Sequence, residues 1–371
     1  MHRLLRIVFT CLLFPAVVSA TPPASTSDPV DVYVSGEGGY HTYRIPAIIR
    51  CTDGSLLAFA EGRKDGQGDS GNIDLLQRRS TDGGVTWSEQ EVLWSDGANT
   101  CGNPCPVVDR TTGRVHLLMT RNLGTDRESM IIDQTSTGSR SVWTMTSDDH
   151  GVRWSAPREL TDQVKAPDWT WYATGPGNGI QLRSGPNQGR LVVPCDHIEA
   201  GTKKYYSHVI YSDDGGATWV MGGTTPTDQV NECAVAELDD GTLLLNMRNY
   251  DRSQRSRAQS RSTDGGATWS EVTHNDQLPE PICQASMIAL EGGRRLVFSN
   301  PASSSSRTAM TVRTSDDGGR EWSKGVLVHE GPSAYSSLVP LDPESVGCLY
   351  ECGEQNPYER IRFQIVDLEA P

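Results

Sequence analysis

The sequence predicts an all-β fold and, more specifically, a six-bladed β-propeller. Two internal repeats support this prediction: an eight-residue turn motif that occurs five times, and a glycine followed by a short apolar strand that occurs six times. No segment shows a sustained helical period, whereas segments such as 361–365 alternate in the two-residue rhythm of a half-buried strand. Short strands at repeat spacing indicate small sheets arranged radially around an axis.

The turn motif is Ser-x-Asp-x-Gly-x-x-Trp. Asp and Ser side chains bond the backbone of a hairpin turn, Gly takes a positive φ angle, and Trp packs the turn onto its sheet. We therefore assign these residues a structural role rather than a catalytic one. The five copies begin at Ser80, Ser147, Ser212, Ser262 and Ser315.

The glycine-strand repeat predicts the number of blades. Its six copies are spaced mostly by 52 to 59 residues, with one interval of 76 that stretches the second unit. No turn motif follows the sixth copy, and we expect the strand at 30–34 to close the ring against the last blade. The copies begin at Gly54, Gly113, Gly189, Gly241, Gly293 and Gly347.

The first twenty residues resemble a secretion signal. A basic start with Arg3 and Arg6 precedes an apolar run at 7–18 and a small-residue cleavage site ending at Ala20. The run is too short for a comfortable membrane span and is interrupted by Pro15. We therefore expect cleavage near Ala20 and export, either to a periplasm or to the medium.

The predicted domain organisation is simple. A signal peptide at 1–20 and a flexible leader at 21–29 precede one propeller domain at 30–371. No later stretch is apolar enough to cross a bilayer, so we expect a monomer with no membrane span. Loss of the signal peptide moves the net charge from −14 to about −16, which disfavours binding to nucleic acid.

Eight cysteines follow the predicted signal peptide. An even number in an exported chain permits disulfides, although their pairing cannot be read from sequence. The spacings of Cys101 with Cys105 and of Cys348 with Cys352 resemble half a zinc site, but no histidine lies nearby. We expect structural thiols or disulfides at these positions, no metal site and no cofactor.

Charged and polar residues follow several of the repeated strands. In a propeller the inner strands end at one face, where their terminal residues line a central pocket. Three guanidinium groups drawn there from separate blades need an anion between them, and a carboxylate accepts their forked donors well. The candidates are Arg44, before the first repeat, then Glu61, Arg63, Arg121, Asp196, Arg248 and Asn300, which leads to Arg307.

Several segments together resemble the sialidase (neuraminidase) superfamily of glycoside hydrolases. They are Tyr-Arg-Ile-Pro at 43–46, Ser-Asn-Pro at 299–301 followed by Arg307, and Gly-Pro-Ser-Ala-Tyr-Ser-Ser at 331–337. The turn motifs alone are weak evidence, because unrelated propellers also contain them. The resemblance covers nearly the whole chain after the signal peptide.

The resemblance implies three catalytic residues. Tyr335 matches the nucleophile, Glu232 the acid that activates it, and Asp69 the general acid/base. A sialoside carries a carboxylate on its anomeric carbon, which repels the carboxylate nucleophile of most glycosidases, and sialidases use tyrosine instead. A phenol has a pKa near 10, so ionising it at neutral pH costs roughly 4 kcal/mol. Glu232 and nearby arginines offset this cost by accepting the proton and stabilising the phenolate.

The resemblance also implies a set of binding residues. Three arginines match the triad that holds the sialic acid carboxylate, Arg63 a contact to a ring hydroxyl, and Glu351 a carboxylate that braces Arg44. Asn103 lies where many bacterial members have Asp and some animal-type members have Asn, so substrate preference is expected to differ from the common bacterial pattern. The binding residues are Arg44, Arg248, Arg307, Arg63 and Asn103, with Glu351 and Asp74 behind them.

Some assignments have local alternatives. Asp69 competes with Asp65 and Asp74 for the acid role, and Glu232 is also compatible with a solvated loop. Trp169, Trp171 and Tyr172 suit either the glycerol or aglycone side of a pocket or the core.

The expected function is exo-α-sialidase activity on glycoproteins, glycolipids or oligosaccharides, with net retention of configuration. A trans-sialidase and a non-catalytic sialoside-binding propeller are the alternatives. The expected partner is a sialylated glycan, whose linkage and acyl form the sequence leaves open.

Overall fold

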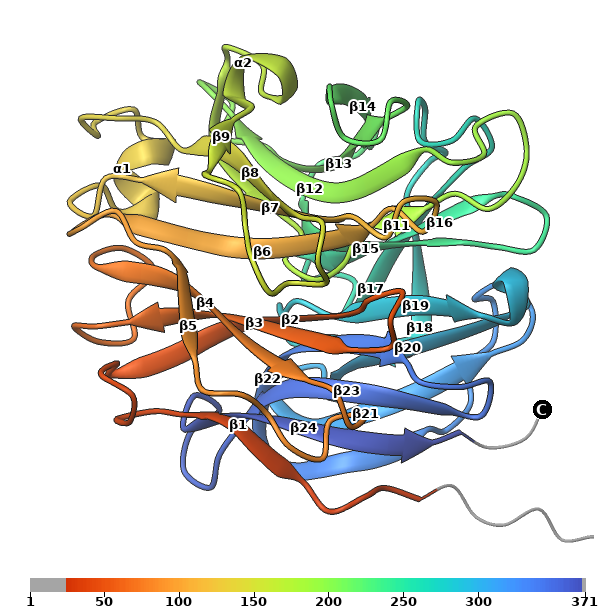
Figure 1. Cartoon of the computed structure of the whole chain (residues 1–371). Coiled ribbons are helices and arrows are strands. Elements are labelled where there is room, and N and C mark those ends of the chain that lie inside the picture. The colour runs from red at the N-terminus through yellow and green to blue at the C-terminus, as the bar shows by residue number, and fades with distance from the viewer. Residues whose placement is uncertain (1–24, 369–371) are drawn as a thin grey trace, which may run out of the picture.

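The computed structural model describes residues 25–368, which form an all-β protein (Figure 1). The predicted signal peptide at 1–20 lies outside these residues. Within residues 25–368, helical structure is limited to α1 (Glu128–Ile132), α2 (Thr161–Val164) and a 3-10 turn (Glu291–Gly293). Among the described helices none is long and apolar enough to cross a membrane.

The largest sheet contains eight strands from the first part of the chain. Its neighbours pair antiparallel, except that β4 meets β6 through one parallel bridge between Ile73 and Thr100. That bridge joins two antiparallel units into one sheet. The strands are β2 (Thr42–Arg50), β3 (Leu56–Arg63), β4 (Ile73–Ser80), β5 (Glu91–Trp94), β6 (Thr100–Val108), β7 (Val115–Asn122), β8 (Ser141–Ser147) and β9 (Arg158–Glu159).

Two smaller sheets follow, with five and four strands. The first contains β10 (Trp169–Thr174), β11 (Ile180–Gln181), β12 (Leu191–Glu199), β13 (Tyr205–Ser212) and β14 (Val220–Thr224). The second contains β15 (Val230–Glu237), β16 (Leu243–Asn249), β17 (Ser256–Ser262) and β18 (Thr273–Pro279).

The last sheet has seven strands because one of them serves two units. Strand β22 is 15 residues long; residues before Ser333 pair with β21, and those from Ser333 onward pair with β23. The seven strands of this sheet are β19 (Ser286–Leu290), β20 (Arg295–Pro301), β21 (Thr308–Ser315), β22 (Val326–Pro340), β23 (Ser345–Cys352), β24 (Arg360–Asp367) and β1 (Val30–Val34).

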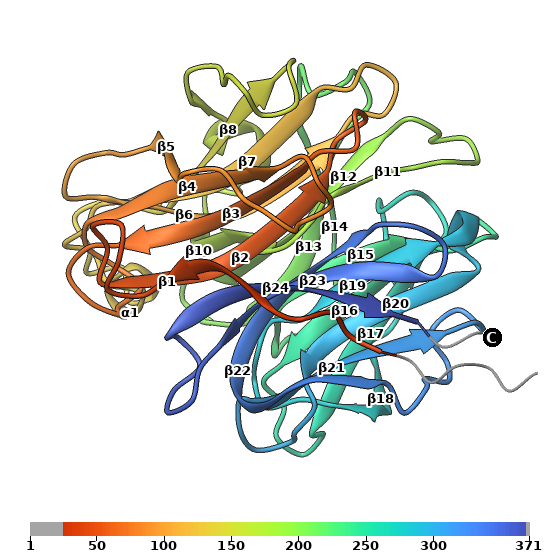
Figure 2. The same ribbon diagram turned by 60° about the horizontal axis from the view of Figure 1, so that its bottom comes forward.

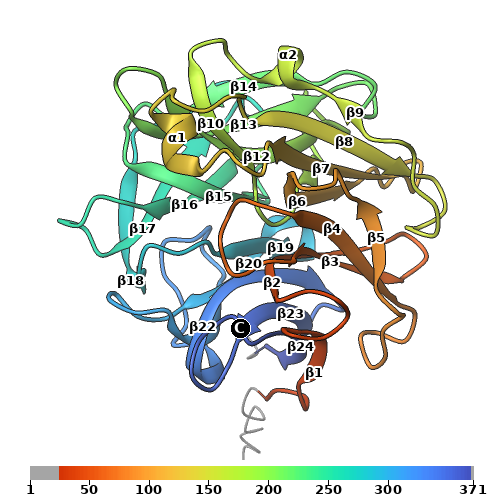
Figure 3. The ribbon, with the colours of Figure 1, turned by 90° about the vertical axis from the view of Figure 1, so that its left-hand side faces the viewer.

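The hydrogen bonds therefore define four sheets, and the predicted count of six blades is not confirmed by them. The continuous strand β22 and the bridge between β4 and β6 each fuse two neighbouring repeat units. In Figure 3 the sheets surround a common centre. Around that centre β2 contacts β6 and β22, and β15 contacts β12 and β19.

The N-terminal strand closes the arrangement, as predicted. β1 pairs antiparallel with β24 near the C-terminus (Figure 2). Asp31 forms ion pairs with Arg360 at 3.0 Å and with Arg362 at 2.6 Å. These contacts tie the two ends of the described chain together.

The five turn motifs share one set of contacts, which confirms their structural role. In each copy the motif serine Oγ accepts a hydrogen bond from the motif glycine N–H, as Ser80 does from Gly84 at 2.9 Å. Gly84 has a φ of +95°, and a Cβ there would collide with Phe363 of the neighbouring sheet. The eight described cysteines are all free and buried, so they act as core thiols and form no disulfides with one another.

Candidate active site

A polar cavity of about 300 Å³ lies at one end of the inner strands. The structure brings eight of the ten predicted site residues to its wall. They come from β2, β3, β6, β15, β16 and β22 and from the loops after β3 and β20, so distant parts of the chain meet here. The eight are Arg44, Arg63, Asp69, Asn103, Glu232, Arg248, Arg307 and Tyr335.

Tyr335 is at the centre of a tight polar cluster. Its Oη donates a hydrogen bond to Glu232 Oε1 at 2.6 Å. Arg248 Nη1 donates to Glu232 Oε2 at 2.6 Å and to Tyr335 Oη at 3.0 Å. Burial and the neighbouring Glu232 carboxylate raise the pKa of Tyr335 well above its usual range, against the opposing effect of three arginines. The phenol is therefore neutral and hydrogen-bonded to a proton acceptor.

Glu351 fixes Arg44 and Tyr335 relative to each other. Its buried carboxylate accepts hydrogen bonds from Arg44 Nε at 2.8 Å and Nη2 at 3.3 Å. It also accepts the backbone N–H groups of Ile45 at 2.8 Å and of Tyr335 at 3.0 Å. A β-bulge after Arg44, with Ile45 at a φ of +59°, aims that backbone N–H at Glu351. Glu351 thus lies directly behind the pocket wall, as expected from the resemblance.

The three predicted arginines gather around Tyr335. The guanidinium carbon of Arg44 lies 5.0 Å from the Tyr335 ring centroid, and that of Arg307 lies 5.6 Å away. Arg307 is held by Tyr358 Oη, which accepts from Nη1 at 2.8 Å, and by the carbonyl of Ile282 at 3.0 Å. Arg248 completes the group through its bond to the phenol. Together these cations form a receptor for a carboxylate beside the phenol oxygen.

Asp69 stands on the opposite side of the pocket, in the loop between β3 and β4. Its side chain is 61% exposed, and it pairs with Arg63 Nη1 at 2.7 Å and Arg44 Nη1 at 3.8 Å. Arg63 is held in turn by Glu61 Oε2, at 3.0 Å from Nε and 2.6 Å from Nη2. Desolvation raises the pKa of Asp69, but the guanidinium groups of Arg63 and Arg44 outweigh it and lower that pKa overall.

The structure does not bring Asp74 into this site. Asp74 accepts a hydrogen bond from Tyr40 at 2.7 Å and pairs with Lys64 at 2.9 Å, and neither partner lines the cavity. Asp74 lies on β4, the third strand after β2 and β3 in its sheet, and no residue of β4 lines the cavity. Arg121, another strand-end candidate, pairs with Asp96 outside the pocket.

Asn103 forms the far wall together with an arginine that sequence reasoning missed. Its Oδ1 accepts hydrogen bonds from Arg140 and from Thr120 Oγ1, and its backbone N–H donates to Glu61 at 2.9 Å. Arg140 stacks on Trp171, 3.9 Å from the ring centroid. Of the three aromatic candidates, only Trp171 lines the cavity; Trp169 and Tyr172 pack against His208 in the core.

Acidic residues line the same wall. Asp196 is buried, and burial together with Glu232 and Glu128 raises its pKa well above the usual range. The pKa of Glu128, on α1, is raised for the same main reason. Glu128 and Arg140 both fall within the 76-residue interval that stretches the second repeat unit. That extra length was the signal that could have located them.

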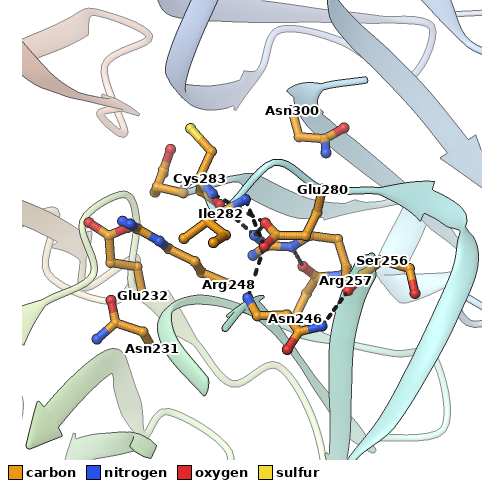
Figure 4. Close-up of polar contacts among 12 residues, drawn as sticks. Asn231, Glu232, Asn246, Arg248, Ser256, Arg257, Glu280, Ile282, Cys283 and Asn300 are labelled. Carbon is orange, nitrogen blue, oxygen red and sulfur yellow. Dashed lines mark hydrogen bonds and ion pairs between the residues drawn. The ribbon is translucent and has the colours of Figure 1, made fainter. Parts of the chain in front are cut away.

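A further buried ion pair, between Arg257 and Glu280, lies behind the pocket rather than in it (Figure 4). Arg257 Nη1 binds Glu280 Oε2 at 3.0 Å, with both side chains fully buried. Glu280 also accepts the backbone N–H groups of Asn249 and Ile282, each at 3.1 Å. Asn249 follows Arg248 in the chain, and the Ile282 carbonyl accepts a hydrogen bond from Arg307. The pair therefore supports the backbone beside two of the three arginines.

The cavity is unsuited to a metal ion, because its carboxylates are interleaved with arginines. Among the residues described, the one group of His, Cys and acidic side chains close enough to share an ion is Cys51, Asp53 and His150, within 4.8 Å of one another. It lies away from the cavity, and Asp53 is already bonded to Ser55 and Arg79.

The fold and the site together define a repeat-built all-β protein with a polar, arginine-lined pocket around a buried tyrosine. A family model described as a BNR repeat-like domain matches residues 54–345. A sialidase of Micromonospora viridifaciens is 38% identical over 87% of this chain. Sialidase-3 of Mus musculus is 31% identical, with 92% of this chain and 94% of the relative covered. The chain belongs to the sialidase family of glycoside hydrolases.

The solved structures agree with this assignment. The Hadza microbial sialidase Hz136 superposes with a TM-score of 0.83 at 32% identity, covering 92% of this chain and 68% of that protein. Trypanosoma rangeli sialidase, at 21% identity and a TM-score of 0.74, covers 93% of this chain and 60% of its own length, and shares the fold. The chain spans 52% of the length of the Micromonospora relative and 64% of that of a Bacteroides fragilis sialidase.

Proposed function

We propose that this chain is an exo-α-sialidase that hydrolyses terminal sialic acids through a tyrosyl-enzyme intermediate with net retention. The observation that carries the proposal is the bonded cluster of Tyr335, Glu232 and Arg248 beside Arg44 and Arg307. It joins a neutral nucleophile, its proton acceptor and a carboxylate receptor in one cavity.

In the first step the three arginines hold the substrate carboxylate and orient the anomeric carbon over Tyr335 Oη. The phenol oxygen attacks that carbon while its proton passes to Glu232, 2.6 Å away. The bond to the leaving oxygen breaks, and Asp69 donates a proton to that oxygen. The product is a tyrosyl glycoside and a free aglycone hydroxyl.

In the second step Asp69, now ionised, removes a proton from water that attacks the same carbon. The bond to Tyr335 breaks, and the phenolate recovers its proton from Glu232. Two displacements at one carbon give net retention. Because Arg63 and Arg44 lower the pKa of Asp69, we expect the first step to favour acidic pH.

The central experiment traps the intermediate. A 2,3-difluorosialic acid should label the chain, and peptide mass spectrometry should place the label on Tyr335. Tyr335→Phe should lose at least about 100-fold in kcat, or roughly 2.7 kcal/mol of transition-state stabilisation, on a fluorogenic sialoside while retaining its melting temperature. Wild-type rates in that variant, or a label elsewhere, would overturn the nucleophile assignment.

Two other functions remain as alternatives. Solved intramolecular trans-sialidases from leech and Ruminococcus gnavus, at 19% identity, share the fold alone. Lactose added to the reaction tests transfer to an external acceptor, which yields a sialylated lactose that hydrolysis does not, whereas intramolecular transfer would release a 2,7-anhydro sugar, as in the leech complex. Binding of a sialoside without turnover would instead indicate a non-catalytic sialoside-binding propeller.

We also propose that the sheets form six blades. Six inner segments support this count: β2, β6, the segment of β10 and β11, β15, β19 and β22, each of which contacts the next around the centre. An experimental structure viewed down the axis would test the count.

The remaining proposals concern the whole protein. We propose that it acts as a monomer, without a cofactor, in the breakdown of sialylated glycoproteins or gangliosides outside the cytoplasm. Size-exclusion chromatography with light scattering tests the monomer. N-terminal sequencing of exported protein tests cleavage near Ala20.

A further inference from the structure

A second cavity lies at the other end of the same inner strands. It has a volume of about 120 Å³. Strand β2 contributes Arg44 to the first cavity and Ile49 and Arg50 to the second, while β22 contributes Tyr335 to the first and Val339 to the second. The second cavity is therefore the opposite mouth of the central channel, about one inner-strand length from the candidate active site.

The wall of this cavity is largely apolar. Inner strands from all around the ring contribute aliphatic side chains or methionine to it, which is the composition typical of a small-molecule pocket. Its main apolar residues are Ile49, Val108, Ile180, Met287, Ile288 and Val339.

Three arginines surround this apolar wall: Arg50, Arg110 and Arg183. Arg50 donates to the Leu341 carbonyl, and Arg183 pairs with Glu237 at 3.3 Å. The Arg110 guanidinium has no hydrogen-bond or ion-pair partner among the described residues. Desolvation, followed by the like charges of Arg183 and Arg50, lowers the pKa of Arg110. Arg110 is itself exposed to solvent at the rim of this cavity.

Two of the three arginines have an acidic neighbour at this mouth: Glu237 pairs with Arg183, and Asp342 lies beside Arg50. The Glu237 carboxylate is buried and already accepts hydrogen bonds from the backbone of Arg183 at 2.7 Å and from Ser184 at 2.8 and 3.1 Å. Asp342, beyond Arg50, is bonded to Ser345 at 2.7 Å. Arg110 is therefore the arginine of this mouth that no carboxylate among the described residues pairs with.

We propose that this opposite mouth binds an amphipathic anion, namely a carboxylate or sulfonate carried on an aryl or alkyl group. The apolar part fills the cavity between the inner strands, and the anionic group binds Arg110 between Arg50 and Arg183. The forked donors of arginine suit such a group.

The probe for this site is 8-anilinonaphthalene-1-sulfonate, an aryl sulfonate whose fluorescence rises in apolar surroundings. Titration of the full chain should show one saturable site, with stoichiometry from calorimetry. The titration is repeated in the presence of an unsaturated sialic acid analogue, 2-deoxy-2,3-didehydro-N-acetylneuraminic acid. This compound is added at a saturating concentration to occupy the first cavity. If the sulfonate still binds when the analogue is present, its site is distinct from the first cavity.

Two variants test the named contacts. Arg110→Gln should weaken binding of the sulfonate at least tenfold, because it removes the unpaired cation. Ala289→Asp places a negative charge in the cavity wall and should weaken it similarly. The matched control is Arg114→Gln. Arg114 is an exposed arginine on the same hairpin as Arg110, and it pairs with Asp148 outside the cavity. It should leave the affinity unchanged, and all three variants should keep the wild-type melting temperature and sialidase rate.

Several results would overturn the proposal. They are the absence of saturable binding, its loss when the sialic acid analogue is added, and equal affinity in Arg110→Gln and the wild type. Equal affinity for the neutral N-phenyl-1-naphthylamine would show an apolar cavity without an anion site. A crystal soaked with the sulfonate should show its sulfonate oxygens on Arg110.

Discussion

Two arginine–glutamate pairs in this molecule have similar contacts but different roles. Arg44 with Glu351 and Arg257 with Glu280 are both buried, and both glutamates also accept two or more backbone N–H groups. Arg44 lies on the inner strand β2 and keeps Nη1 directed toward Asp69 across the cavity. Arg257 lies on β17, farther from the axis, and binds Asn246 and the Cys283 carbonyl, so it does not reach the cavity (Figure 4).

The difference shows that position relative to the axis decides the role of a buried ion pair. At an inner strand end, glutamate holds one edge of the guanidinium and leaves the other for a ligand. Arg63 with Glu61 follows the same pattern, because Arg63 Nη1 reaches Asp69. In the outer strands the same pairing only joins loops. We therefore expect substitutions in the outer pair to change stability and those in the inner pairs to change substrate binding.

The largest expected effect follows loss of the outer glutamate. Glu280→Ala leaves the fully buried Arg257 without its carboxylate, and should lower the free energy of unfolding by about 3–5 kcal/mol. Urea denaturation measures this change. The double variant Glu280→Leu with Arg257→Met should recover only part of the loss, because no charge from this pair then remains buried but the backbone N–H groups of Asn249 and Ile282 lose their acceptor. A loss below about 1 kcal/mol in the single variant would contradict the account.

A matched pair of isosteric variants separates stability from binding. Glu351→Gln removes the charge behind Arg44 and turns an amide N–H₂ toward a backbone donor, so KM for a fluorogenic sialoside should rise about tenfold, or 1.4 kcal/mol. Glu280→Gln makes the same chemical change in the outer pair and should raise KM less than about threefold. Equal KM values in the two variants would remove the distinction between inner and outer pairs.

The pH dependence of the reaction tests the third pair. Asp69 acts as an acid only while protonated, so the rate falls as pH rises through its pKa. Arg63 lowers that pKa, and Arg63→Gln should therefore move the basic limb of the kcat profile to higher pH. An unchanged limb, measured with a substrate whose leaving group needs protonation, would count against Asp69 as the acid.

The last prediction concerns a half-buried lysine that has no glutamate partner among the described residues. Lys165 Nζ donates to Ser139 Oγ and to the carbonyls of Arg140 and Thr170. Burial, and then the charge of Arg140, lowers the pKa of Lys165 from 10.5 to about 7. The unfolded chain therefore binds this proton more readily, so stability falls as pH drops from about 10.5 toward 7. Lys165→Met should flatten the dependence of melting temperature on pH in that range, and an unchanged slope would contradict it.

The sequence predicted most of the elements that build the pocket, but little of what lies behind it. Repeats and strand ends gave a wider set of candidates that included Arg121, and the resemblance to sialidases selected Arg44, Arg248 and Arg307 from it. Nothing in the local pattern distinguished Arg257 from these, since side-chain direction and distance from the axis depend on tertiary packing. Arg140 was missed because it lies in an insertion without repeat spacing.

The sheet count has a similar explanation. The repeats indicated where strands and turns lie, but whether neighbouring strands join into one sheet depends on single backbone contacts. The bridge between Ile73 and Thr100 and the continuity of β22 at Ser333 are of this kind. No sequence pattern predicts them. The position of Asp74 depends in the same way on the sheet, because β4 is separated from the inner strand β2 by β3 and none of its residues lines the pocket.

The pairing of β1 with β24 has a consequence for biosynthesis. During translation the first strand has no hydrogen-bonding partner until the residues around Arg360 and Arg362 emerge from the ribosome. Until then β1 and the growing edge beside it are free to pair with other chains, which is a hazard for aggregation. The charged side chains of Asp31, Arg360 and Arg362 on these strands disfavour such mispairing and favour the native match once both strands exist.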